Sequence, residues 1–127
     1  MENMIRRLTL PALFLAISLS ALSTARAAEA PFEPALMRLS EVLGSLHYLD
    51  NLCGQEKTRW RGLMEKLLTA EAPDDARKAR FVANFNRGYR SFASVYSGCT
   101  DSAQAALMRY RNEGEDLASQ TAARFGN

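Results

Sequence analysis

The sequence has few of the side chains from which metal sites and covalent active sites are built. Its 127 residues include one histidine, His47, and two cysteines, Cys53 and Cys99. A structural zinc site takes four ligands, mostly Cys and His, so these residues cannot complete one. The haem-attachment pattern C-x-x-C-H and the nucleophile pattern G-x-S-x-G are both absent. We therefore expect no metal, no other cofactor and no catalytic residue, and we expect His47 to be a partly buried, locally hydrogen-bonded helix residue.

The N-terminal segment has the three parts of a secretory signal peptide. Two arginines precede an uncharged apolar run at residues 8–22 (LTLPALFLAISLSAL), and Ala25-Arg26-Ala27 fits the small-residue cleavage rule. The run is shorter than the roughly 20 residues of a membrane-spanning helix. We therefore expect a signal peptide at residues 1–27, cleaved after Ala27 or after Ala30, and one helical domain at residues 28–127. Such a domain would be periplasmic, with no transmembrane span after cleavage.

Cleavage would also remove the excess of basic residues. The whole chain has 16 Lys and Arg against 14 Asp and Glu. Removing residues 1–27 takes away three arginines and one glutamate, which leaves 13 of each sign. A nucleic-acid-binding domain is usually net basic, so we expect no nucleic-acid partner.

Apolar residues recur at three- and four-residue spacing in four segments, which predicts four helices at about residues 34–52, 57–70, 75–97 and 100–125. No alternating strand pattern is present. Asp74 or Asp75 is expected to cap the third helix and Thr100 or Asp101 the fourth. The apolar face of the first helix is made of leucines, whereas that of the third is aromatic. The aromatic residues are Phe81, Phe85, Tyr89, Phe92 and Tyr96.

Four helices joined by short turns predict an all-α fold, a small up-down four-helix bundle. Cys53 ends the first predicted helix and Cys99 ends the third, and alternate helices of such a bundle end at the same pole. In an oxidising compartment a pair of cysteines most simply forms a disulfide. We therefore predict a Cys53–Cys99 disulfide. Glycines within the predicted helices favour close helix crossings over a ligand site; they are Gly44, Gly62, Gly88 and Gly114.

The third predicted helix carries the candidate partner-binding surface. Arg80 and Arg87 share one line of the helical wheel and Arg90 lies about 60° away, so we expect all three to point opposite the aromatic face. Arginine forks bind carboxylates and phosphates well. Asn84 and Asn86 complete the candidate surface. The competing interpretation is an ordinary solvated face, neutralised by acidic residues of adjacent helices.

Three segments carry a resemblance to a known family. They are RLSEVLGSLHYLDNLCG (38–54), AEAPDDARKARFVANFNRGYRSFASVYSGCT (70–100) and RYRNEGEDLASQTAARFGN (109–127). They resemble a family of small exported proteins from alphaproteobacteria that is catalogued as a domain of unknown function. The resemblance implies export and a small helical domain, and it brings no reaction, cofactor or catalytic residue.

Together these observations favour a non-enzymatic periplasmic protein that binds another component of the cell envelope. The expected partner is an envelope protein or a peptidoglycan component. One alternative is a small envelope enzyme that acts on peptidoglycan through a carboxylate, and another is a ligand- or metal-binding helical bundle. A cleft that contains a buried Glu or Asp with a raised pKa would favour the enzyme. A filled aromatic core would leave no such cleft.

Overall fold

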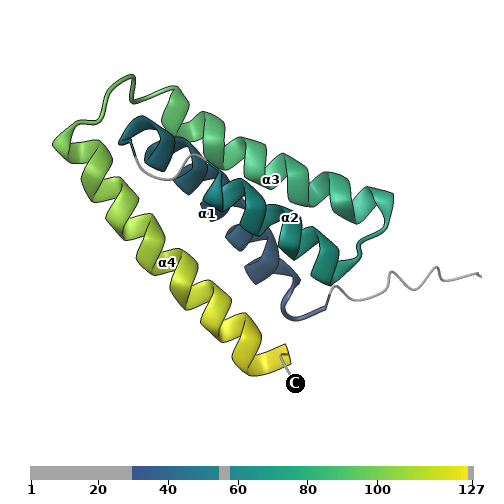
Figure 1. Cartoon of the computed structure of the whole chain (residues 1–127). Coiled ribbons are helices and arrows are strands. Elements are labelled where there is room, and N and C mark those ends of the chain that lie inside the picture. The colour runs from purple at the N-terminus through teal and green to yellow at the C-terminus, as the bar shows by residue number, and fades with distance from the viewer. Residues whose placement is uncertain (1–29, 55–57, 126–127) are drawn as a thin grey trace, which may run out of the picture.

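The computed structural model describes residues 30–54 and 58–125, which form four helices (Figure 1). These are α1 (Glu33–Leu52), α2 (Arg59–Glu71), α3 (Asp75–Ala93) and α4 (Asp101–Phe125), and the described ranges contain no strand. Consecutive helices run in opposite directions, which confirms the predicted all-α, up-down arrangement. None of the helices in these ranges is long and apolar enough to cross a membrane. The predicted signal peptide lies outside the described residues.

Side-chain caps begin α3 and α4 where the sequence predicts them. The Asp74 carboxylate accepts a hydrogen bond from the backbone N–H of Arg77 at 2.8 Å, and the Thr100 hydroxyl accepts one from the N–H of Ala103 at 3.1 Å. Such caps satisfy N–H groups that have no partner within the helix. The predicted end of α3 at Ser97 is wrong, because the backbone turns back earlier and the helix ends at Ala93.

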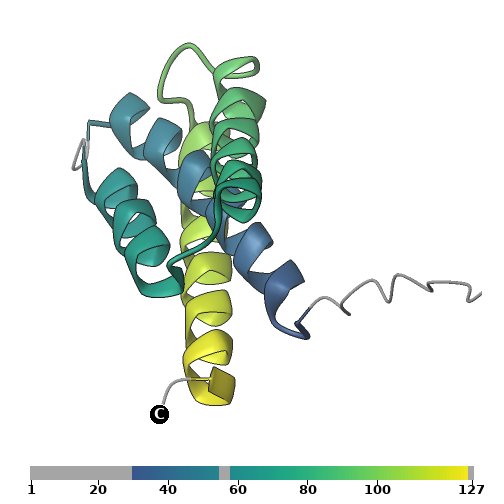
Figure 2. The same cartoon turned by 90° about the vertical axis from the view of Figure 1, so that its right-hand side faces the viewer.

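Helix α1 is the centre of the fold. It contacts all three other helices, most extensively α3, whereas α2 makes only a small contact with α3. Figure 1 and Figure 2 both show α1 surrounded by the other three helices. The core contains Leu36, Val42, Leu43, Leu46, Leu49, Trp60, Met64, Phe81, Ala103, Ala106 and Leu107. Helix α2 is the shortest helix and rests mainly on α1. The surfaces between α2 and α3 and between α2 and α4 therefore stay partly open.

Two glycines allow α1 and α3 to pack backbone against backbone. A Cβ atom added to Gly44 would lie 1.9 Å from the carbonyl oxygen of Phe85, and one added to Gly88 would lie 1.9 Å from that of Glu41. No neighbouring atom lies within 4 Å of a Cβ added to Gly62. The predicted close crossing is therefore confirmed at Gly44 and Gly88 but is wrong at Gly62.

The disulfide pairs Cys53 with Cys99, as predicted, and joins the end of α1 to the loop between α3 and α4. Their Cα atoms are 4.9 Å apart, within the usual range for a disulfide. The bridge spans 46 residues of sequence. Closing a loop of that length stabilises the fold by about 4 kcal/mol in the chain-entropy model, an upper-end figure.

Candidate functional site

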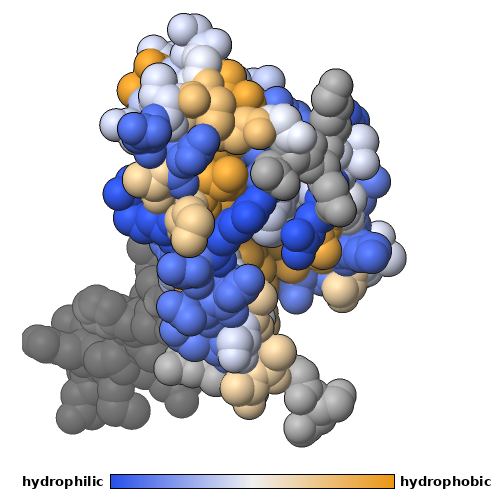
Figure 3. Space-filling view, turned by 60° about the vertical axis from the view of Figure 1, so that its left-hand side comes forward, coloured by the Kyte–Doolittle hydropathy of each residue, from blue (hydrophilic) through white to orange (hydrophobic). Residues whose placement is uncertain are grey.

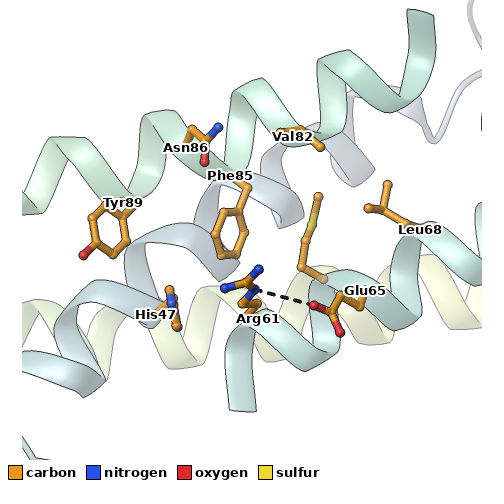
Figure 4. Close-up of a pocket in the computed structure, with 9 residues that line it drawn as sticks. His47, Arg61, Glu65, Leu68, Val82, Phe85, Asn86 and Tyr89 are labelled. Atoms are coloured by element: carbon orange, nitrogen blue, oxygen red, sulfur yellow. Dashed lines mark ion pairs between the residues drawn. The ribbon is translucent and has the colours of Figure 1, made fainter. Parts of the chain in front are cut away.

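The main candidate site is an open groove of about 480 Å³ between α2 and α3, with α1 as its floor (Figure 4). Nothing in the helical pattern indicated a groove at this position. The groove stays open because α2 packs mainly on α1 and only slightly on α3. The lining residues are His47 of α1, Arg61, Met64, Glu65 and Leu68 of α2, and Val82, Phe85, Asn86 and Tyr89 of α3. Of the α3 aromatic face, Phe81 is fully buried, whereas Tyr89 is 37% exposed.

His47 lies on the floor of the groove. Its ring centroid is 5.8 Å from that of Phe85 and 5.8 Å from that of Tyr89. Burial lowers the pKa of His47 below its ordinary value of 6.5, and the charge of Arg61 lowers it further. The imidazole is therefore neutral at pH 7. The local hydrogen bond expected for His47 is not found for its Nδ1 atom, which is buried without a partner among the described residues.

The rim of the groove is polar. Arg61 and Glu65 of α2 form an ion pair at 3.5 Å, and both side chains are 69% exposed. Exposed pairs of this kind contribute little to stability, so both groups remain available to a ligand. Asn86 of α3 is exposed, and its side chain makes no hydrogen bond to another described residue. Its amide carries both donors and an acceptor.

Two of the three candidate arginines of α3 reach back to α1. Arg80 Nη2 lies 2.8 Å from Glu33 Oε1, and Arg87 Nη2 lies 2.7 Å from Glu41 Oε2. For Arg80 and Arg87 these ion pairs agree with the competing interpretation, an exposed face neutralised by acidic residues of an adjacent helix. The close crossing of α1 and α3 brings the glutamates of α1 within reach of these arginines.

The remaining members of the candidate surface divide between the two sides of α3. Asn84 accepts a hydrogen bond from Arg87 at 2.6 Å and donates one to the carbonyl of Arg80 at 2.8 Å, so it belongs with the α1-facing pairs. Asn86 lines the α2–α3 groove. Arg90 follows Asn86 by about one helical turn, is exposed, and forms no ion pair with a described residue. The candidate surface is therefore split: Asn86 lines the groove, the other two arginines and Asn84 lie on the α1 side, and Arg90 is exposed but does not line the groove.

The buried carboxylate of Glu33 has a structural role at the start of α1. Glu33 is 3% exposed, and Arg77 of α3 holds its carboxylate with contacts of 2.7 to 3.0 Å. Arg77 also contacts Glu71 of α2 at 2.7 Å. The hydrogen bonds from Arg77 lower the pKa of Glu33, although burial opposes them. A general acid needs the opposite shift, and Glu33 does not line the groove.

A second buried carboxylate ties three helices together. Asp50 of α1 is 1% exposed. It accepts hydrogen bonds from the indole N–H of Trp60 in α2 and from Arg111 of α4, the latter at 2.5 Å. Both buried carboxylates therefore serve packing between helices. Within residues 30–54 and 58–125, no three His, Cys, Asp or Glu side chains are grouped so that they could hold a metal ion.

Comparison with known proteins places this domain in a family. A family model described as "Protein of unknown function (DUF2385)" matches residues 31–125. The chain belongs to this family. The match covers all four helices and both cysteines, so the predicted resemblance to a family of unknown function is confirmed. No curated protein and no solved structure matches the chain.

Proposed function

We propose that this member of the DUF2385 family is an exported, non-enzymatic binding protein of the cell envelope, and that its α2–α3 groove holds a peptide segment of its partner. The N-terminal signal pattern and the Cys53–Cys99 disulfide support export, because disulfides persist in oxidising compartments. The partner is a peptide of an envelope protein or of peptidoglycan.

The observation that carries this proposal is the open groove itself, with aromatic side chains on its α3 wall and hydrogen-bonding groups on its rim. Phe85 and Tyr89 offer apolar area, and the amide of Asn86 can pair with both the N–H and the C=O of a peptide. The charged groups Arg61 and Glu65 stand at the α2 edge. This combination of an apolar surface with a few polar groups is typical of binding sites.

The same residues argue against the enzyme alternative. His47 is neutral at pH 7, and its Nδ1 atom has no carboxylate to orient it within the described part of the chain. The buried carboxylates of Glu33 and Asp50 are held by arginines outside the groove. A general acid or base needs a positioned partner and access to the substrate.

The candidate surface on α3 enters the proposal in two parts. Asn86 lines the groove and Arg90 is exposed one helical turn further along α3, so we propose them as the primary contacts of the partner. Arg80 and Arg87 are 53% and 61% exposed but already neutralise glutamates of α1. Together with Asn84 they would act as a secondary contact. Arg90→Ala is therefore the clean test of this surface, because replacing Arg80 would also remove a partner of the buried carboxylate at the start of α1.

Site-specific photo-crosslinking in intact cells tests the proposal. A photoreactive amino acid replaces Val82, which lines the groove and is 40% exposed. The matched control replaces Val95, which is 67% exposed and does not line the groove. We expect one discrete adduct from position 82 that is lost when Tyr89→Ala is added, and none from position 95. Equal adducts from both positions, or none from position 82, would contradict the proposal.

A further inference from the structure

We infer that a second groove, between α2 and α4, binds a fatty-acid-like ligand, that is, a single acyl chain that ends in a carboxylate. This site is separate from the peptide groove and does not depend on it. It has a volume of about 400 Å³, which lies within the usual range for small-molecule sites.

The walls of this groove suit an acyl chain. Three helices supply its apolar lining: Leu39 and Leu43 from α1, Leu63 and Leu67 from α2, and the small residues Gly114 and Ala118 from α4. Leu63 is 37% exposed, so part of this apolar surface faces water. In Figure 3, which brings the α4 side of the molecule forward, hydrophobic side chains lie between hydrophilic ones. Burying this apolar surface under an acyl chain would be favourable.

The charged residues along the groove favour an anionic end group. Arg59, Lys66 and Arg111 line it, against one acidic residue, Glu115. Arg59 lies over the ring of Trp60, with its Cζ atom 4.7 Å from the ring centroid. Neither Arg59 nor Lys66 forms an ion pair with another described residue. Within the described residues, each of these two cations is therefore available to a ligand carboxylate, at positions two turns of α2 apart.

Arg111 adds a further cationic side chain to the lining of the same groove. One of its nitrogens holds Asp50, and the side chain is 36% exposed. Asp50 also accepts a hydrogen bond from the indole N–H of Trp60, and Arg59 lies over the ring of the same tryptophan. Since Arg111 contacts Asp50, both arginines lie near Trp60 at one part of the groove. A guanidinium fork is well suited to a ligand carboxylate. Apolar walls beside a cluster of cationic side chains favour a small amphiphile with an anionic end.

Isothermal titration calorimetry of the oxidised protein tests this inference, with decanoate as the probe. Decyltrimethylammonium has the same chain with the opposite charge, and butanoate has the same charge with a short chain. We expect saturable one-to-one binding of decanoate, and about tenfold weaker binding of decyltrimethylammonium, the size of one charged hydrogen bond. Butanoate should not bind measurably, because affinity grows with each buried methylene.

Two arginine variants distinguish binding at this groove from a general attraction of the anionic probe to basic residues. Arg59→Ala should weaken decanoate binding about tenfold. Arg109→Ala is the matched control, because Arg109 also lies over an aromatic ring, that of Tyr110, but does not line the groove. Asn86→Ala in the peptide groove should leave decanoate binding unchanged, so the two sites can fail separately. No saturable binding of decanoate, equal binding of both charged amphiphiles, or equal losses in Arg59→Ala and Arg109→Ala would overturn the inference.

Discussion

The rings of His47 and Tyr89 lie 5.8 Å apart, although one belongs to α1 and the other to α3. This contact joins the floor of the α2–α3 groove, at His47, to its aromatic α3 wall. The floor depends on the close packing of α1 against α3, whereas α2 supplies the charged rim. The stability of the α1–α3 contact and the chemistry of the groove are therefore linked.

The lowered pKa of His47 predicts a pH dependence of stability. The unfolded chain takes up a proton at His47 near its ordinary pKa of 6.5, whereas the folded chain resists protonation until the pH is lower. Because the unfolded state then binds more protons, the contribution of His47 is complete above pH 6.5 and is lost as the pH falls through the folded pKa. Thermal unfolding between about pH 7 and pH 5 should show this loss in the wild type and less of it in His47→Gln. An unchanged pH slope in the variant would contradict the assignment.

The close crossing of α1 and α3 predicts opposite effects at two glycines. Gly88→Ala should destabilise the protein by about 1–3 kcal/mol, the usual cost of overpacking, because the new Cβ meets the backbone of Glu41. Gly62→Ala should stabilise it by up to about 1 kcal/mol, because alanine favours the helix and the position is open. Urea unfolding measures both. Equal effects of the two substitutions would argue against the crossing.

Loss of the disulfide should lower stability strongly. The Cys53→Ser, Cys99→Ser double variant should lose up to about 4 kcal/mol of unfolding free energy, because the unfolded chain regains its loop entropy. Non-reducing peptide mass spectrometry of the wild type should show the Cys53–Cys99 linkage. Two free thiols, or a variant with an unchanged melting temperature, would remove the disulfide from this account.

The buried Asp50 predicts a large effect for a small chemical change. Asp50→Asn should cost about 1–3 kcal/mol, because it removes the charged partner of Arg111, whose side chain is 36% exposed, and weakens the hydrogen bond from the buried indole of Trp60. Glu65→Gln is the control, because its ion pair with Arg61 is exposed, and it should change stability by less than about 1 kcal/mol. Chemical unfolding followed by circular dichroism compares the two. A mild effect of Asp50→Asn would show that Asp50 does not tie the helices together.

The sequence predicted the parts of the fold that depend on local patterns. Helical periodicity indicated the four helices, and the placement of Cys53 and Cys99 indicated the disulfide and the helix order. The caps at Asp74 and Thr100 follow from their short polar side chains. The end of α3 could not be read in this way, because the aromatic spacing continues to Tyr96 while the helix ends at Ala93.

The candidate site depended on tertiary contacts and was predicted less well. A helical wheel places Arg80 and Arg87 on α3, but it does not show that Glu33 and Glu41 of α1 lie within reach. The groove likewise depends on how α2 rests on α1, which no pattern within α2 specifies. Tyr89 was the available signal, because a hydroxyl on an apolar face indicates that the face is not fully buried.

The affinity of the crosslinked partner for two variants tests the central claim, that the α2–α3 groove is the binding site, most directly. Once the component captured from position 82 is identified, its binding can be compared between Tyr89→Ala, which alters the groove, and Met108→Ala, which removes a 63% exposed apolar side chain on α4. We expect about tenfold weaker binding for Tyr89→Ala, the size of one lost aromatic contact, and no change for Met108→Ala. Unchanged binding by Tyr89→Ala, in a variant that is still folded, would contradict the claim.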